Sequence, residues 1–330
     1  METLKFEVDQ ESIEKAGEII RKGGLIAFPT ETVYGLGANA YDSRAVRSVY
    51  AAKGRPSDNP MIVHIAHFDQ LEDVVSEVPE VGRQLMDVFW PGPMTLIMKK
   101  NDEISDATTG GLDTVGVRMP SNRTAAAFLN SCRVPVAAPS ANLSGKPSPT
   151  TCEDVLEDMD GRIDGIIMGE QCDVGIESTV IDVTGDHPVI LRPGFITAEM
   201  IRKSLNIEVT YDPALFMEPD QSDFHPKAPG MKYKHYSPKA DVQIVEGDQE
   251  KALRIIGELS TKAQAEGKKT ALIDYGRDSR EAARDFFARL RELDREDVDI
   301  IYVYALPEED LGFSVMNRML KSAGYNVIHA

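Results

Sequence analysis

Two basic side chains close to a predicted helix end are the first candidates for chemistry in this sequence. Lys53 and Arg55 stand in "AAKGRPSDNP", where Gly54 and Pro56 must end a helix. Two cations so close together can neutralise phosphate or carboxylate groups of a ligand. They could equally be solvated charges that complement the C-terminal end of the helix.

A second candidate lies in the apolar run "TVGVRMP". Strand alternation places Thr114, Gly116 and Arg118 on one face and Val115 and Val117 on the other. A glycine between the threonine and the arginine could leave room for a ligand against the sheet, or it could serve packing alone. Both interpretations stay open at this point.

Polar residues also follow other predicted strands. Thr30 and Thr32 come after "LIAF" and before a glycine-rich turn, where a turn or capping role is the simpler interpretation. Arg192 ends the apolar strand of "ILRPG", and a cation there usually has an anionic partner.

The loop "PSANLSGKPSPT" carries many hydrogen-bond donors and little apolar cover. This combination suits a phosphate-binding loop, although a plain surface loop would also fit. Its polar residues are Ser140, Asn142, Ser144, Lys146 and Ser148.

The segment "APGMKYKHYSP" (228–238) is basic and aromatic, whereas the chain as a whole has a formal net charge of -18. It falls in a Pro-rich stretch, 206–240, that has no amphipathic periodicity. So long a loop is typical of a functional loop or an interdomain linker. Both interpretations stay open at this point.

Several familiar signals are missing from the sequence. It has no G-x-x-x-x-G-K-[ST] loop, "GLGANA" lacks the third glycine of a dinucleotide loop, and there is no G-x-S-x-G motif. His64 and His67 form an HxxH pair without cysteines at metal-ligand spacing, which disfavours zinc.

Composition limits the cellular setting and the partners. The three cysteines form no CxxC pair, and the N-terminal "METLKFEVDQE" has no apolar targeting region, so we expect a cytoplasmic, reducing location away from membranes. A sequence pI near 4.8 disfavours a broad nucleic-acid surface. At 330 residues and 42% hydrophobic composition, two domains are expected.

The elements that position these residues belong to an α/β fold. Up to about residue 205, many short strands with few helices between them predict a twisted mixed sheet with flanking helices. From residue 241 a regular strand–helix alternation predicts a small Rossmann-like α/β domain. We therefore expect a first domain over 1–205, a linker or functional loop over 206–240, and a C-terminal domain over 241–330. The helices expected in the first part are 10–21, 43–52, 79–89, 123–131 and 151–159, with Ser43 and Thr151 as N-caps.

Taken together and in order, the motifs resemble those of the YrdC/YwlC family of threonylcarbamoyl-AMP synthases. They are "PTETVYGLG", "KGRPSDNPMIVHI", "WPGPMTLI", "TVGVRMP", "AAPSANLSGKPSPT", "ESTVIDVT" and "ILRPGFIT". The linker "APGMKYKHYSP" and the ending "DLGFSVMNRMLKSAG" are similar to the long, two-domain form of that family. The resemblance implies a catalytic domain over 1–205 and, within 206–240, an active-site flap that closes over the bound triphosphate, with a plain linker as the alternative. Asn122 and Arg123 stand where family members often read P-x-H-P, which affects only local loop detail.

The resemblance implies condensation of L-threonine, bicarbonate and ATP, with Mg²⁺ on the triphosphate, into threonylcarbamoyl-adenylate and pyrophosphate. The product would feed N6-threonylcarbamoyladenosine formation at position 37 of tRNA through a separate transfer system, so direct tRNA binding is left open. Catalytic roles are implied for Lys53 and Arg55. The ATP-binding residues implied are Arg55, Asn59, Thr114, Ser140, Asn142, Ser148, Arg192, His235 and Tyr236. Those implied for threonine are Thr32, His64, Arg118, the backbone at Ala138, and Ser178.

Two rival functions remain at this stage. One is a related carbamoyl-adenylate chemistry in hydrogenase maturation, but the acylphosphatase-like and zinc-finger segments of those proteins are not seen in the sequence. The other is a double-stranded RNA or ribosome-binding module, which would favour a broad basic stripe.

Overall fold

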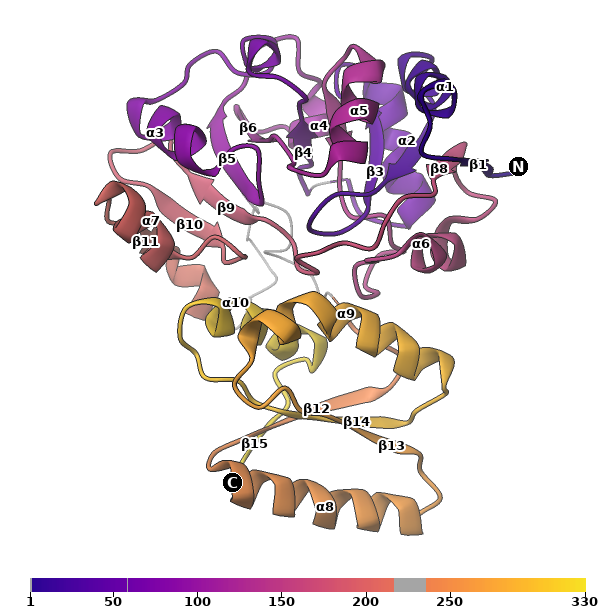
Figure 1. Cartoon of the computed structure of the whole chain (residues 1–330), viewed down its shortest axis with the longest axis vertical. Coiled ribbons are helices and arrows are strands. Elements are labelled where there is room, and N and C mark those ends of the chain that lie inside the picture. Colours follow the sequence, from indigo (N-terminus) through magenta and orange to yellow (C-terminus); the bar gives the residue numbers. More distant parts are fainter. Residues whose placement is uncertain (1, 58, 217–235) are drawn as a thin grey trace. The chain divides into compact units, whose positions relative to one another are not determined.

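The computed structural model describes residues 2–57, 59–216 and 236–330, and these fall into two compact units (Figure 1). Within the described residues, the first unit holds the chain up to Ser144 and again from Pro149 to residue 216. The second unit holds Gly145–Ser148 and the residues from Tyr236 to the C-terminus.

The first unit is built on an eleven-stranded mixed sheet in the order β1-β8-β2-β3-β7-β4-β6-β5-β9-β10-β11. The central strands form both parallel and antiparallel pairs. Strand β4 is parallel to β6 and antiparallel to β7, and β5 is antiparallel to β6 and parallel to β9. The strands are β1 (Leu4–Phe6), β2 (Ile26–Phe28), β3 (Gly35–Asn39), β4 (Ile62–His64), β5 (Met94–Lys99), β6 (Thr114–Arg118), β7 (Val136–Ala138), β8 (Gly165–Ile167), β9 (Thr179–Asp182), β10 (Val189–Arg192) and β11 (Thr210–Tyr211).

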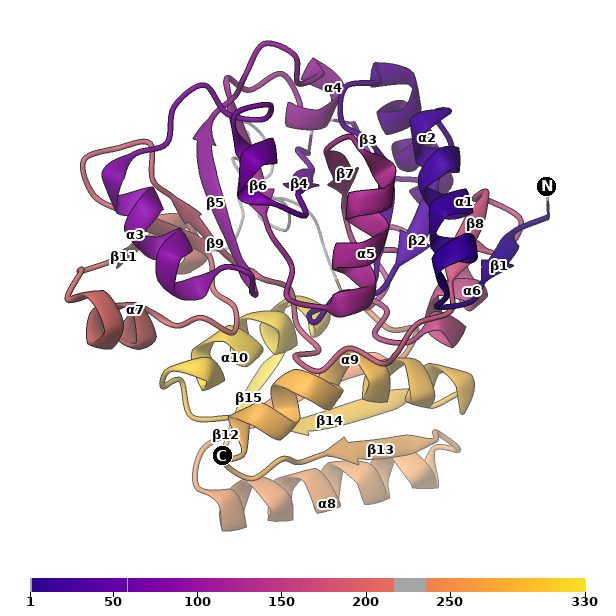
Figure 2. The same ribbon diagram turned by 45° about the horizontal axis from the view of Figure 1, so that its top comes forward.

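Helices flank this sheet, as the sequence predicted. They are α1 (Gln10–Arg21), α2 (Ser43–Lys53), α3 (Glu80–Phe89), α4 (Asp106–Thr109), α5 (Arg123–Cys132), α6 (Cys152–Met159) and α7 (Ala198–Leu205), with 3-10 turns at Phe68–Leu71 and Pro213–Phe216. Helices α1 and α5 lie side by side (Figure 2). Both contribute to the apolar cluster that also contains Phe28 of β2 and Val136 of β7.

One predicted cap is wrong and another is confirmed. Thr151 caps α6, since its hydroxyl accepts from the Asp154 N–H at 3.2 Å. Helix α2 is capped by Asp42, whose carboxylate accepts from the Arg44 and Ala45 N–H groups, and not by Ser43. The Ser43 hydroxyl instead contacts that of Ser105 at 2.6 Å. The partial positive charge at a helix N-terminus stabilises a carboxylate more than it stabilises a hydroxyl.

Strand alternation in β6 is as predicted, but Gly116 has a packing explanation. Val115 and Val117 belong to the largest apolar cluster. A side chain at Gly116 would press on Ile97 and Thr95 of β5, at 3.1 and 3.2 Å from the added Cβ. The space beside this glycine is therefore occupied by protein side chains.

The second unit is a four-stranded parallel sheet in the order β13-β14-β12-β15, which confirms the predicted Rossmann-like α/β fold class. Helix α8 lies on one face of this sheet, and α9 and α10 lie on the other (Figures 1 and 2). The strands are β12 (Asp241–Glu246), β13 (Thr270–Ile273), β14 (Ile300–Tyr304) and β15 (Val327–His329), and the helices are α8 (Gln249–Ala265), α9 (Ser279–Arg295) and α10 (Leu311–Ser322).

Buried polar contacts inside the second unit involve its Gly145–Ser148 segment. Arg291 is 2% exposed, and its Nη2 donates to the Pro147 carbonyl at 2.7 Å. The ring of Tyr236 packs on that of Phe287 with centroids 4.9 Å apart. Among the described residues, no helix has the length and apolar character needed to cross a membrane.

Candidate functional site

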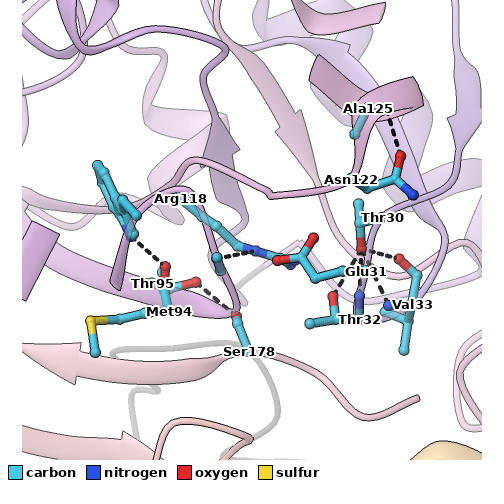
Figure 3. Close-up of polar contacts among 12 residues, drawn as sticks. Thr30, Glu31, Thr32, Val33, Met94, Thr95, Arg118, Asn122, Ala125 and Ser178 are labelled. Carbon is cyan, nitrogen blue, oxygen red and sulfur yellow. Dashed lines mark hydrogen bonds and ion pairs between the residues drawn. The ribbon is translucent and has the colours of Figure 1, made fainter. Parts of the chain in front are cut away.

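The turn that follows β2 is fixed by its own hydroxyl groups. The Thr30 hydroxyl donates to the Val33 carbonyl at 2.6 Å and lies 2.9 Å from the Thr32 hydroxyl (Figure 3). It also accepts from the Thr32 N–H at 3.2 Å. Thr30 thus has the turn role that its position predicted, and Thr32 is held fully buried beside it.

Between these two threonines, Glu31 points at Arg118 (Figure 3). Glu31 Oε1 lies 2.8 Å from Arg118 Nη2, and the two side chains are only 7% and 4% exposed. Arg118 Nε also donates weakly to the Gly92 carbonyl, at 3.4 Å. Sequence reasoning named Arg118 but missed Glu31, because an acid in a turn is ordinarily solvated. The signal that could have found it is its place within the otherwise uncharged run "GGLIAFPTETVYGLG".

His64 is the neighbour of Arg118 in the sheet, since the two residues pair in register across β4 and β6. The imidazole is 4% exposed and meets the Phe28 ring edge-on at 5.9 Å. Burial, with a smaller contribution from the Arg118 charge, lowers the pKa of His64 to about 3. The ring is therefore uncharged near neutral pH, and it can donate or accept a hydrogen bond without adding a charge to the site.

Ser178, just before β9, contacts residues of two further strands, β5 and β10. Its hydroxyl lies 2.8 Å from the Thr95 hydroxyl of β5 and accepts from Arg192 Nη2 of β10 at 3.1 Å. Arg192 Nε also donates to the Ser178 carbonyl at 3.1 Å. Thr95 was missed by the sequence analysis, since it sits inside the apolar strand "MTLIMK", where a buried threonine is usually structural.

Lys53, at the end of α2, is buried among groups of the Ser140–Asn142 loop. The ammonium donates to the Ser140 carbonyl, to the Asn142 carbonyl at 2.6 Å and to Asn142 Oδ1 at 3.3 Å. Lys53 is 3% exposed. The Ser140 hydroxyl in turn donates to Asn142 Oδ1 at 2.5 Å. The structure thus brings together residues that are almost ninety positions apart in the sequence.

Arg55 lies two residues further along, beyond the end of α2, with its guanidinium 5.7 Å from the centre of the Tyr50 ring. Its Nη2 donates to the Asn59 carbonyl at 3.2 Å. The Asn59 side chain is completely buried, and neither its oxygen nor its nitrogen has a hydrogen-bond partner among the described residues. Buried side-chain amides are usually hydrogen-bonded in folded proteins, so Asn59 is an exception among the described residues.

The remaining predicted site residues lie at strand ends, in the second unit, or outside the described residues. Thr114 begins β6, and Ala138 ends β7 opposite Ile62 of β4. Ser148 falls in the segment that groups with the second unit, as does Tyr236. His235 and most of the predicted flap, 228–235, lie outside the described residues.

The described residues hold no group of three or more His, Cys, Asp or Glu side chains that could bind a metal ion. The second histidine of the HxxH pair, His67, lies 3.0 Å from Asn130 Oδ1 through its Nε2. Asn122, in the segment that departs from the family pattern, caps α5 through the Ala125 N–H at 2.8 Å (Figure 3).

Two protein families match the chain over adjoining ranges. The family described as "Telomere recombination" matches residues 18–194. The family described as "Threonylcarbamoyl-AMP synthase, C-terminal domain" matches residues 196–324.

Similar proteins extend over the whole length. The threonylcarbamoyl-AMP synthase of Pyrococcus abyssi is 47% identical over 98% of this chain and 98% of its own. That of Bacillus subtilis is 43% identical over 99% of this chain and 97% of its own. A crystal structure of P. abyssi Sua5 complexed with L-threonine superposes with a TM-score of 0.94, at 45% identity, and covers 100% of both chains.

Proposed function

Because the chain belongs to the two-domain threonylcarbamoyl-AMP synthase family, we propose that it condenses L-threonine, bicarbonate and ATP into threonylcarbamoyl-adenylate and pyrophosphate. The resemblance seen in the sequence motifs is thereby confirmed. Family membership favours this activity over the RNA-binding module and over the hydrogenase-maturation chemistry. We also propose the division into a catalytic domain (1–205), a linker or flap (206–240) and a C-terminal domain (241–330).

The observation that carries the proposal is the contact between Lys53 and the Ser140–Asn142 loop. A lysine that is 3% exposed and held by carbonyl and amide oxygens is a rigid positive charge. The reaction needs such a charge, because a carbamate anion must approach the α-phosphate of ATP. Lys53 and Arg55 would offset the repulsion between the two anions.

We propose that ATP binds along the Lys53 side of the site. The Asn59 amide is buried and has no hydrogen-bond partner among the described residues, which supports a polar ligand there, because such a ligand could supply the hydrogen bonds. The ATP-binding set proposed is Arg55, Asn59, Thr114, Ser140, Asn142, Ser148, Arg192, His235 and Tyr236. Mg²⁺, when bound, would screen the triphosphate, and we propose that phosphate and water oxygens hold it, because it needs few protein ligands.

Threonine is proposed to bind beside His64 and Arg118, at the ends of β4 and β6. The planar Arg118 guanidinium suits its carboxylate, and the neutral His64 imidazole suits its hydroxyl. Thr32, the Ala138 backbone and Ser178 complete the proposed set. The L-threonine complex of the P. abyssi relative supports threonine as the amino acid for this chain. The adenylate would then pass to a separate system that modifies tRNA.

The test is pyrophosphate release from ATP with each co-substrate omitted in turn. We expect release only when threonine and bicarbonate are both present. The matched control is serine in place of threonine, which should give a weaker but detectable rate, because serine lacks only one methyl group. Release that is unaffected by omitting threonine would reject the proposed reaction.

A further inference from the structure

Glu31 is a buried carboxylate whose hydrogen-bonding capacity is unused. Its side chain is 7% exposed, and neither oxygen accepts a hydrogen bond from any described residue. The 2.8 Å contact with Arg118 Nη2 is an ion pair, but within the described part of the chain that nitrogen too lacks a hydrogen bond of good geometry. An ionised carboxylate can accept at about four lone-pair positions, so the site is incomplete without a donor.

The backbone that carries Glu31 is held firmly, so the aim of its side chain is set by the fold. The Glu31 carbonyl accepts from the Val174 N–H at 2.8 Å, and the Thr32 carbonyl accepts from Gly175 at 3.1 Å. The Thr30 hydroxyl closes the turn from inside. Figure 3 shows the carboxylate directed at the Arg118 guanidinium and not toward the Thr30 side of the turn.

A buried acid beside a buried guanidinium matches one chemical class of ligand, the zwitterion of an α-amino acid. Its carboxylate and ammonium groups sit on one carbon atom, so they can face a cation and an anion that are neighbours. An ammonium offers three N–H donors, which is what the Glu31 oxygens lack. Hydrogen bonds between charged groups are the stronger ones, particularly in a desolvated site.

We infer that Glu31 accepts the α-ammonium group of the amino-acid substrate, while Arg118 holds its carboxylate. This rests on the proposed function for the placement of threonine at Arg118. Glu31 then makes the site selective for an amino acid over a 2-hydroxy acid of the same shape. The Arg118 charge remains balanced both before and after the substrate enters.

The experiment compares two ligands on two proteins by calorimetry with the full chain. The ligands are L-threonine and its 2-hydroxy analogue of the same configuration, in which a hydroxyl replaces the ammonium group. Wild type should bind threonine about 10- to 100-fold more tightly than the analogue. In Glu31→Gln, which keeps the size and one acceptor oxygen, threonine affinity should fall by about that factor while the analogue is little changed.

The matched control is Thr30→Val, which disturbs the same turn without touching the carboxylate. It should weaken both ligands by equal factors. Trp90 fluorescence verifies folding, and if Glu31→Gln does not fold, Glu31→Asp replaces it. The shorter carboxylate should still cost threonine more than it costs the analogue.

The outcomes separate the two claims. Equal losses for both ligands in the Glu31 variants would mean that Glu31 only orients Arg118, and this would overturn the inference while leaving threonine binding intact. A wild-type protein that binds no threonine would overturn the proposed function and the inference together.

Discussion

Removing one partner of the Glu31–Arg118 pair should destabilise the first unit more than removing both. The substitutions are Arg118→Met, Glu31→Leu and the double variant, each of which replaces a charged chain by an apolar one of comparable length. Each single change leaves a charge buried without its partner. The double change leaves none.

The magnitude follows from the geometry. Unit charges 2.8 Å apart attract by about 6 kcal/mol at an effective dielectric constant of about 20. Burial of each charge costs several kcal/mol, so the pair itself contributes little net stability. Each single variant should lose about 3–5 kcal/mol, and the double variant should lose less than either.

The assay is urea unfolding followed by tryptophan fluorescence. Trp90 is the only tryptophan of the chain and lies in the first unit, 7% exposed, with its Nε1 donating to the Met94 carbonyl at 2.8 Å. Its signal therefore reports the first unit separately from the second. The free energies of unfolding can be compared only if their slopes against urea concentration are equal among the variants.

Arg202→Met is the control, since the Arg202 side chain is 57% exposed and pairs with Glu199 of the same helix, α7, at 2.6 Å. It should change the free energy of unfolding by less than about 0.5 kcal/mol. The reasoning would be refuted if the double variant lost the sum of the two single losses within about 0.5 kcal/mol, because the two side chains would then act independently.

Three further predictions concern other residues. Lys53→Ala and Arg55→Ala should each lower turnover by about 10²- to 10³-fold in the pyrophosphate assay, the usual scale for one preorganised donor, and wild-type turnover in a folded variant would contradict this. His64, whose pKa is lowered to about 3, stays neutral when folded but takes up a proton when unfolded below about pH 6.5. As the pH falls from about 6.5 toward 3, the free energy of unfolding should therefore decrease more steeply in wild type than in His64→Gln. Parallel curves of unfolding free energy against pH for the two proteins would contradict this prediction. All three cysteines are buried, and burial raises the pKa values of the Cys132 and Cys172 thiols, so a thiol reagent should label the chain only as it unfolds; rapid labelling of native protein would be the opposite result.

Local patterns were enough to predict most of the fold. The helix expected over 10–21 is α1 as observed, because its apolar residues recur on one face and Asp9 caps it. Strand β11, Thr210–Tyr211, was missed, since two residues in a Pro-rich stretch show no alternation. The alternation rule placed Arg118 correctly, but it could not tell that Gly116 makes room for Ile97 and not for a ligand.

The site depends on contacts that local patterns do not contain. Lys53 and Asn142 meet only because the loop after β7 passes the end of α2, and the family motifs, not the periodicity, pointed to both. Glu31 was overlooked because its burial depends on its contact with Arg118, although three strands separate β2 from β6 in the sheet. Charge partners across a mixed sheet depend on the topology and curvature of the sheet, which local sequence patterns do not reveal.

The central claim is that this chain joins threonine, bicarbonate and the adenylyl group of ATP in one product. Mass spectrometry of a reaction run with ¹³C-bicarbonate tests it most directly. We predict a threonylcarbamoyl-adenylate that carries the label and disappears when Lys53 is replaced by Ala. An unlabelled threonyl-adenylate, or AMP and pyrophosphate formed without any labelled adduct, would contradict the account.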